Sequence, residues 1–544
     1  MEMSDSVEDF SESGTLILPQ RRGRRYATVD EAIEAAGWFH HRLLILCGLM
    51  WAADAIEILC IAYVLPAAEC ELSLTSSDKG WLNATVFMGL MTGGCVGGIV
   101  GDFFGRKGVL FISMISNGLF GIASSFMPSF WPFLSLRFLS ACGVGAALPV
   151  NMPYFAEFQP SKVRGRMVTF LASFFLVGNV IAAAFAWSVI PSSIVMYLGT
   201  FKYAPWRLFV ALCGIPSALA GCLVLYFPES PRYLMTEGKN REALEILRYV
   251  WSVNNQRNHG GYLRLNENFP VDEIVGSKEA RVERKSIVKT TLNHVKQLLC
   301  GSIKRNFWIL FSIHFSIAFG YYGLMMWFPE IFNRLLKYRS LHPTVDDVGI
   351  CDVRLPEEDV APPTCSPLDP LVYANQMLLA IAPFPTNVWN ILHMDKLGRK
   401  FFLVVSMVGA GASVFAVWLV RSQLENLLVS MAFSSVSNMG FNSLNCLATE
   451  LFPTKLRSTA MALTAGALRI GAFLGNIAFG YFIDAYCVIP MVAVACLMMD
   501  SAPALLEPGR LWLVLLPTLR SLPPPESDTG TFLRPIVKKR RTIF

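Results

Sequence analysis

The stretch Gly101-Asp102-Phe103-Phe104-Gly105-Arg106-Lys107 joins two long apolar runs, and a shorter copy, Asp395-Lys396-Leu397-Gly398-Arg399-Lys400, occurs far downstream. A second motif, AEFQPSKVRG, has its own copy, TELFPTKLRS. Matching positions are always 293 residues apart (395 − 102, 398 − 105, 450 − 157, 453 − 160 and 457 − 164). A constant interval across two motifs predicts two halves with the same helix and loop lengths. Repeated halves of six spans are typical of transporters, which hold solute near the midplane between the halves.

Composition agrees with a membrane protein. The 544-residue chain is 53% hydrophobic and 16% charged, whereas soluble domains carry about 25% charged residues. Apolar runs long enough to cross a bilayer predict an all-α bundle of twelve spans. They lie near 43–65, 81–101, 108–128, 132–154, 167–190, 206–227, 306–332, 373–394, 401–420, 424–448, 459–484 and 487–516. The last one is doubtful, because Asp500, Glu507 and Arg510 interrupt it.

Basic residues set the expected orientation. They fall on alternate loops, so the positive-inside rule places both termini and the loop 228–305 in the cytoplasm. The net charge of +6 comes from short clusters at helix ends, which suits the anionic leaflet rather than nucleic acid. We expect five regions: an N-terminal region 1–42, a first half 43–227, a loop 228–305, a second half 306–516 with a luminal loop 333–372, and a tail 517–544.

Two acids, Asp54 and Glu57, lie in the middle of the first apolar run. A carboxylate inside a span costs roughly 2.5–3.5 kcal/mol on insertion scales, so such groups usually face a pathway or a partner. Three residues apart on a helix, the two side chains share one face. We expect them to line a transport cavity and to couple an ion or bind solute. The alternative is a carboxylate satisfied by a neighbouring span, for example through Arg137.

Other candidates could line the same cavity. Asn438 and Asn442 share one helix face and could form hydrogen bonds with solute or with other helices. Trp187 and Trp327 could stack on a flat ligand or attract a cation, whereas Tyr321 is a candidate of the same kind as the two asparagines. Tryptophan at a lipid or interfacial position is the alternative for the first two.

The quoted loop resembles the signature loop of the major facilitator superfamily, and its second copy is correctly placed. This resemblance implies a rocking bundle of two six-helix halves and a latch at the cytoplasmic side. The gating candidates that follow are Asp102, Gly105, Arg106, Arg137, Glu157, Arg164, Asp395, Arg399, Glu450 and Arg457. The sequence Pro228-Glu229-Ser230-Pro231-Arg232 resembles the sugar and organic-ion branches, and we interpret it as structural and gating.

A narrower resemblance is to the synaptic vesicle glycoprotein 2 family. It is carried by the stretch 319–330 (FGYYGLMMWFPE), together with Ala53–Glu57 and Ala186–Pro191, and its most specific part is YYGL-x-x-WFP at 321–329. This resemblance implies a synaptic or secretory vesicle membrane, or the plasma membrane, and vesicle-protein partners at the N-terminus. The loop 333–372 is short and has no Asn-x-Ser/Thr, which argues against glycan-dependent partners.

Cys351 and Cys365 lie in that hydrophilic loop and could form a disulfide with each other. No catalytic, metal or nucleotide constellation appears, so we expect neither an enzyme nor a cofactor. The leading hypothesis is a secondary transporter of a small organic or charged solute. The competing hypothesis is a non-transporting vesicle protein that regulates secretion through partners.

Overall fold

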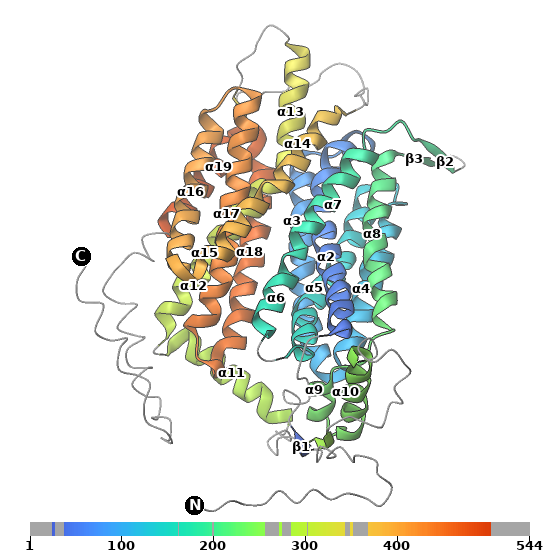
Figure 1. Cartoon of the computed structure of the whole chain (residues 1–544). Helices are drawn as coiled ribbons and strands as arrows, with labels where there is room; N and C mark the ends of the chain where they lie inside the picture. The colour runs from blue at the N-terminus through green and yellow to red at the C-terminus, as the bar shows by residue number, and fades with distance from the viewer. Residues whose placement is uncertain are drawn as a thin grey trace, which may run out of the picture.

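A computed structural model describes residues 24–27, 37–160, 163–198, 201–255, 271–274, 284–301, 303–342, 349–351 and 368–501. The chain folds into an all-α bundle of two six-helix halves that stand side by side (Figure 1). We call the end of the bundle that carries α13 (Phe328–Leu341) the upper end. The end near α9 (Pro231–Thr236) and α10 (Asn240–Asn255) is the lower end.

The first half is built from six spans, the fifth of which is divided at Ser173. Its helices are α2 (Trp38–Leu72), α3 (Ser76–Phe104), α4 (Arg106–Ser124), α5 (Phe130–Glu157), α6 (Arg164–Ala172), α7 (Phe174–Val189) and α8 (Pro205–Val224). A short antiparallel hairpin, β2 (Met196–Leu198) with β3 (Phe201–Tyr203), precedes α8.

The second half follows a connection at the lower end that includes α11 (Arg284–Cys300). There, β1 (Arg24–Ala27) pairs in parallel with β4 (Val271–Ile274). The remaining helices are α12 (Lys304–Met325), α13, α14 (Pro370–Ile381), α15 (Pro383–Leu397), α16 (Arg399–Leu419), α17 (Gln423–Leu451), α18 (Thr454–Tyr486) and α19 (Val488–Ser501).

Local sequence explains where the helices begin and turn. The Thr75 hydroxyl accepts a hydrogen bond from the Asp78 amide, and the Asp78 carboxylate accepts one from the Thr75 amide, which is a capping box at the start of α3. Gly105 and Gly398 end α3 and α15 with φ values of +93° and +90°. Glycine adopts this backbone region without steric cost. These glycines occupy the same place in the two copies of the quoted loop.

Within the described residues, nine helical segments are long and apolar enough to cross a membrane. The other three spans deviate from that pattern. α17 is long but carries several serine and asparagine residues, and the pair α14–α15 breaks at Ala382 before Pro383. α19 has 14 described residues, or about 21 Å of helix.

The predicted spans are found, and most helices run past their predicted ends. α13 continues to Leu341, beyond the expected end of the seventh span at 332. The segment after α9 forms the amphipathic helix α10. The predicted continuation of the last span to 516 and the tail 517–544 lie outside the described residues.

The halves meet most closely where α3 crosses α18 at the upper end. A Cβ built at Gly480 would lie 2.7 Å from the Cα of Gly80, so the two backbones are in contact. Elsewhere α7 packs on α14, and α13 packs on α2.

We expect Gly480→Val to destabilise the upper-end contact, because overpacking two backbones in contact costs about 1–3 kcal/mol. The thermal midpoint of the purified protein in detergent should fall by several degrees. Gly466→Val is the matched control, since a Cβ there would meet no described atom within 4 Å. Equal midpoints for the two variants would contradict the contact.

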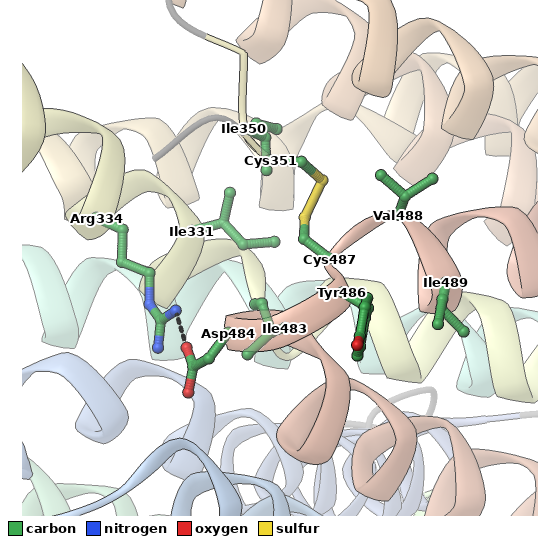
Figure 2. A pocket seen from close by; sticks show the side chains of 10 residues that line it. All are labelled: Ile331, Arg334, Ile350, Cys351, Ile483, Asp484, Tyr486, Cys487, Val488 and Ile489. Carbon is green, nitrogen blue, oxygen red and sulfur yellow. Dashed lines mark hydrogen bonds and ion pairs between the residues drawn. A yellow bond between two sulfur atoms is a disulfide. The ribbon is translucent and has the colours of Figure 1, made fainter. Parts of the chain in front are cut away.

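A disulfide corrects the expectation for the luminal cysteines. Cys351 is bonded to Cys487, with Cα atoms 5.4 Å apart, and not to Cys365. Cys70 is also disulfide-bonded. The Cys351–Cys487 bond ties the segment after α13 to the turn between α18 and α19, beside a cavity whose lining includes Arg334 and Asp484 (Figure 2). Sequence spacing missed this partner because it lies 136 residues away.

Candidate functional site

A buried ion pair lies halfway along the first half. The Glu57 carboxylate on α2 is 2.7 Å from Nη2 of Arg137 on α5, and the two side chains are 1% and 0% exposed. The Ser140 hydroxyl lies 2.6 Å from the same carboxylate oxygen. Glu57 is therefore satisfied by a neighbouring span through Arg137, which is the alternative that the sequence left open.

The polar network continues across the first half. The Asn117 side chain on α4 lies 2.8 Å from the Ser140 hydroxyl and donates to the Ser217 hydroxyl on α8 at 2.7 Å. Four helices, α2, α4, α5 and α8, are thus linked through one buried cluster. Buried polar groups that are satisfied in this way fix the relative positions of helices.

Asp54 differs from Glu57 although both lie on one helix face. Its side chain is fully buried, and neither carboxylate oxygen has a hydrogen-bond partner among the described residues. An unpaired buried carboxyl group is expensive to maintain. Among the described residues, no contact therefore compensates the burial of the Asp54 carboxyl group.

The second half brings together the other polar candidates. Tyr321 on α12 lies close to Asn438 and Ser434 on α17. The Asn442 amide donates to Asn387 at 2.6 Å. The Phe441 ring lies between the two asparagines in sequence and 5.2 Å from the Tyr321 ring. These groups form a polar and aromatic cluster at mid-height of the second half.

The two tryptophans lie outside that cluster. Trp327 is fully buried, and its ring stacks on Phe479 at 6.3 Å, which joins the end of α12 to α18. Trp187 is 51% exposed on α7. Sequence patterns could not separate these environments, because both residues lie in apolar stretches.

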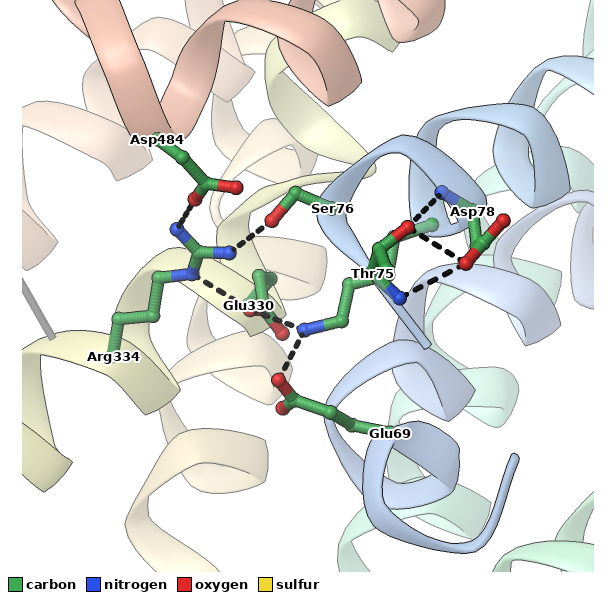
Figure 3. Close-up of polar contacts among 8 residues, drawn as sticks. Glu69, Thr75, Ser76, Asp78, Glu330, Arg334 and Asp484 are labelled. Atoms are coloured by element: carbon green, nitrogen blue, oxygen red, sulfur yellow. Dashed lines mark hydrogen bonds and ion pairs between the residues drawn. The ribbon is translucent and has the colours of Figure 1, made fainter. Parts of the chain in front are cut away.

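The upper end holds a cross-half network that sequence reasoning missed (Figure 3). Nζ of Lys79 on α3 lies 2.6 Å from the Glu330 carboxylate on α13 and 3.1 Å from Glu69 on α2. The same Glu330 oxygen accepts from Nε of Arg334 at 2.7 Å. Arg334 also donates to Asp484 on α18 at 2.6 Å and to Ser76 on α3 at 2.8 Å. We call Lys79, Glu330, Arg334 and Asp484 the upper gate.

Other contacts between the halves lie near the upper gate. The Tyr373 hydroxyl donates to the backbone oxygen of Tyr63, and the Trp81 indole donates to the Tyr481 hydroxyl. The signal that could have found the gate was present in the sequence. Glu330 directly follows the most specific stretch of the family resemblance, and Lys79 lies just before the predicted second span.

At the lower end, the predicted gating residues form one ion pair within each half. The Arg106 guanidinium is 3.8 Å from Glu157, and the Arg399 guanidinium is 3.0 Å from Glu450. These pairs are related by the same interval of 293 residues, so the sequence repeat is also a repeat of contacts. Arg164 donates to the Gln159 backbone, and Arg457 is half-buried. The side chains of Asp102 and Asp395 lie outside the described part of the structure.

Glu229 caps the start of α4 at the lower end. Its carboxylate accepts hydrogen bonds from the backbone amides of Arg106 and Lys107, the first two residues of α4. A negative charge at a helix N-terminus is favourable because the first amides have no partner within the helix. Glu229 therefore ties the segment after α8 to the quoted loop.

The spacing between α3 and α18 changes with height. Gly80 and Gly94 lie on one face of α3, and Gly466 and Gly480 on one face of α18, because 14 residues (94 − 80 and 480 − 466) are close to four turns. The two helices are in backbone contact at Gly80 and Gly480. One turn below Gly94, a Cβ at Gly98 would meet no described atom within 4 Å, and the same holds at Gly466. The helices therefore part toward the lower end.

Two duplicated six-helix halves with buried charges at mid-height define a polytopic membrane transport protein. Residues 34–340 match the family model for sugar (and other) transporters, and residues 371–544 match that of the major facilitator superfamily. The chain belongs to the sugar (and other) transporter family of the major facilitator superfamily, as the quoted loop indicated.

Relatives and solved structures agree with this assignment. The chain is 26% identical to synaptic vesicle glycoprotein 2B of Homo sapiens over 88% of its own length and 84% of the relative. It is 27% identical to synaptic vesicle glycoprotein 2C of Mus musculus over 84% of the chain and 76% of the relative. The xylose transporter XylE from E. coli, in a partially occluded inward open conformation, matches with a TM-score of 0.61 and 17% identity. That match covers 87% of this chain and 99% of XylE.

Proposed function

We propose that this protein is a secondary transporter of a small organic or charged solute, in which Asp54 and Glu57 couple a proton or cation to movement of the solute. The observation that carries the proposal is the buried set Asp54, Glu57 and Arg137 at mid-height of a duplicated bundle. Ionisable groups at this depth of a membrane protein usually belong to an ion or solute pathway.

Alternating access is supported by the contrast between the two ends. The upper gate joins the halves through ion pairs and hydrogen bonds, whereas the described lower ion pairs Arg106–Glu157 and Arg399–Glu450 each lie within one half. α3 and α18 touch above and part below. This arrangement corresponds to a conformation closed at the upper end, which rocking of one half against the other would reverse.

The coupling step would use the Glu57–Arg137 pair. Protonation of Glu57 removes the charge that holds Arg137, so the contact between α2 and α5 weakens when a proton binds. Asp54, one turn away and without a hydrogen-bond partner among the described residues, is a second acceptor for a proton or cation. Each elementary charge that crosses a potential of 100 mV supplies about 2.3 kcal/mol, which is enough energy to drive such a cycle.

A second candidate function is regulation without transport. It is favoured by the relatives, which are named as synaptic vesicle glycoproteins. In this case the bundle would serve as a vesicle membrane protein whose N-terminal region binds partners. Location in a synaptic or secretory vesicle, or in the plasma membrane, is part of both proposals.

The deciding experiment is uptake of a panel of solutes into proteoliposomes under an imposed pH gradient. We expect gradient-driven uptake by the wild type, and its loss in Asp54→Asn and Glu57→Gln. Arg241→Gln is the control, because its side chain is 94% exposed on α10. If uptake is unchanged in both the Asp54→Asn and the Glu57→Gln variant, these two acids do not couple transport to the gradient. No flux for any solute would favour the regulatory function.

A further inference from the structure

Arg469 is a charged residue about midway along the span Leu456–Asp484 of α18, and sequence reasoning did not single it out. Its guanidinium reaches across the boundary between the halves. A Cβ built at Gly94 on α3 would lie 2.8 Å from Nη1 of Arg469 and 3.2 Å from its Cζ. The glycine thus makes room for the guanidinium against the α3 backbone.

The guanidinium of Arg469 has no carboxylate partner among the residues that the structure describes. Three other arginines at buried or partly buried positions within spans pair with carboxylates: Arg137 with Glu57, Arg207 with Glu71 and Arg334 with Glu330. Among the described residues, no carboxylate oxygen lies within 4.0 Å of Arg469. A cation at mid-membrane without a partner is costly and is retained mainly where a pathway or ligand uses it.

The position of Arg469 is accessible from the lower end. It lies opposite Gly94, where α3 and α18 begin to part, and its side chain is half-buried. One turn farther down, Gly98 faces open space, as does Gly466 on α18. A solute that enters between the halves from below would therefore meet this guanidinium at the top of the opening.

Aromatic and amide groups surround the approach to Arg469. Its charge interacts with the side chain of Tyr322 on α12. The Tyr322 ring lies 4.9 Å from Phe87 on α3 and 5.9 Å from Phe441 on α17. Asn438 and Asn442 flank Phe441 on α17 and are half-buried. Rings whose faces suit stacking on a flat ligand thus lie beside one cation and two amides.

We propose that Arg469 binds the charged group of the transported solute, and that this solute is an organic anion with a flat or aromatic body. The inference rests on the proposed transport function and names its substrate class. A guanidinium binds a carboxylate with two parallel hydrogen bonds. Ring faces add stacking contacts, and the asparagine amides can donate to further oxygens of the solute.

The test uses three aromatic probes of matched size and different charge: benzoate, benzamide and benzylamine. Each is added at millimolar concentration to the purified full-length protein in detergent, and the thermal midpoint is measured. Benzoate should raise the midpoint of the wild type more than the neutral and cationic probes. In Arg469→Gln its apparent affinity should fall about tenfold or more, because a charged hydrogen-bond partner is lost. Arg469→Lys should retain part of the effect.

Two further variants separate binding from folding defects. Gly94→Ala places a methyl group 2.8 Å from Nη1 of Arg469 and keeps the charge, so it should weaken benzoate binding with the fold intact. Arg241→Gln removes an exposed positive charge on α10 and should bind benzoate as the wild type does.

Equal stabilisation by all three probes, no stabilisation by benzoate, or unchanged benzoate binding in Arg469→Gln would each overturn the inference. Transport is tested separately in proteoliposomes. If benzoate binding depends on Arg469 but no flux is measured, the anion site is supported and the transport function is contradicted. Flux of cations or neutral solutes that Arg469→Gln leaves unchanged would sustain transport and remove the anion site.

Discussion

Replacing Arg137 with methionine is expected to lower the free energy of unfolding by about 3–5 kcal/mol, because Glu57 would stay buried without its partner. Glu57 is 1% exposed, so water cannot replace the lost contact. The thermal midpoint in detergent and the yield of monodisperse protein should both fall sharply. This is one of the two largest effects that we expect from a single substitution.

The double variant Arg137→Met/Glu57→Gln provides the control. Removing both charges of a buried pair is often close to neutral for stability, so most of the thermal midpoint should return. Proton-driven uptake should remain absent, since the titrating group is gone. A single Arg137→Met variant as stable as the wild type would show that the pair does not hold α2 and α5 together.

The second large effect is expected from Glu330→Gln in the upper gate. One Glu330 oxygen accepts from both Lys79 and Arg334, so the substitution leaves two cations in a buried site without their shared anion. Losing one member of a buried ion pair costs about 3–5 kcal/mol, and this cost falls on the conformation closed at the upper end. A shift of about 5.5 kcal/mol takes a two-state population from 99:1 to 1:99.

A reporter cysteine measures this shift. Tyr63→Cys places a thiol at a buried position next to the contact with Tyr373. A membrane-impermeant maleimide should label it several-fold faster in the Glu330→Gln background, after subtraction of labelling without the reporter. Asp484→Asn is the matched control and should have a small effect, because that carboxylate is 58% exposed. Equal labelling rates in all backgrounds would show that the gate does not hold the upper end closed.

Sequence patterns predicted the bundle well, because spans follow from apolar length and the repeat follows from a constant interval. The pairs Arg106–Glu157 and Arg399–Glu450 show that the interval also preserves contacts. The different environments of Asp54 and Glu57 could not be predicted. Both lie on one face of α2, and only the packing of α5 against that face decides which acid meets Arg137.

Contacts between distant segments were the other part that the sequence could not provide. Lys79 and Glu330 are 251 positions apart, and neither lies in a motif that the loop repeat marks. Arg469 lies in an apolar run with no charged neighbour nearby in sequence, so its meaning depends on which helix lies opposite. The structure shows that the helix opposite Arg469 is α3, where Gly94 faces the guanidinium.

The disulfide between Cys351 and Cys487 bears on the orientation of the protein in its membrane. Cross-links of this kind form and persist in the secretory pathway, on the cell surface and in the periplasm, while the cytosol keeps thiols reduced. We therefore propose that the end of the bundle that holds this bond is the non-cytosolic face. Thiol chemistry and the distribution of lysine and arginine over the connecting loops are independent criteria, and both predict the same orientation.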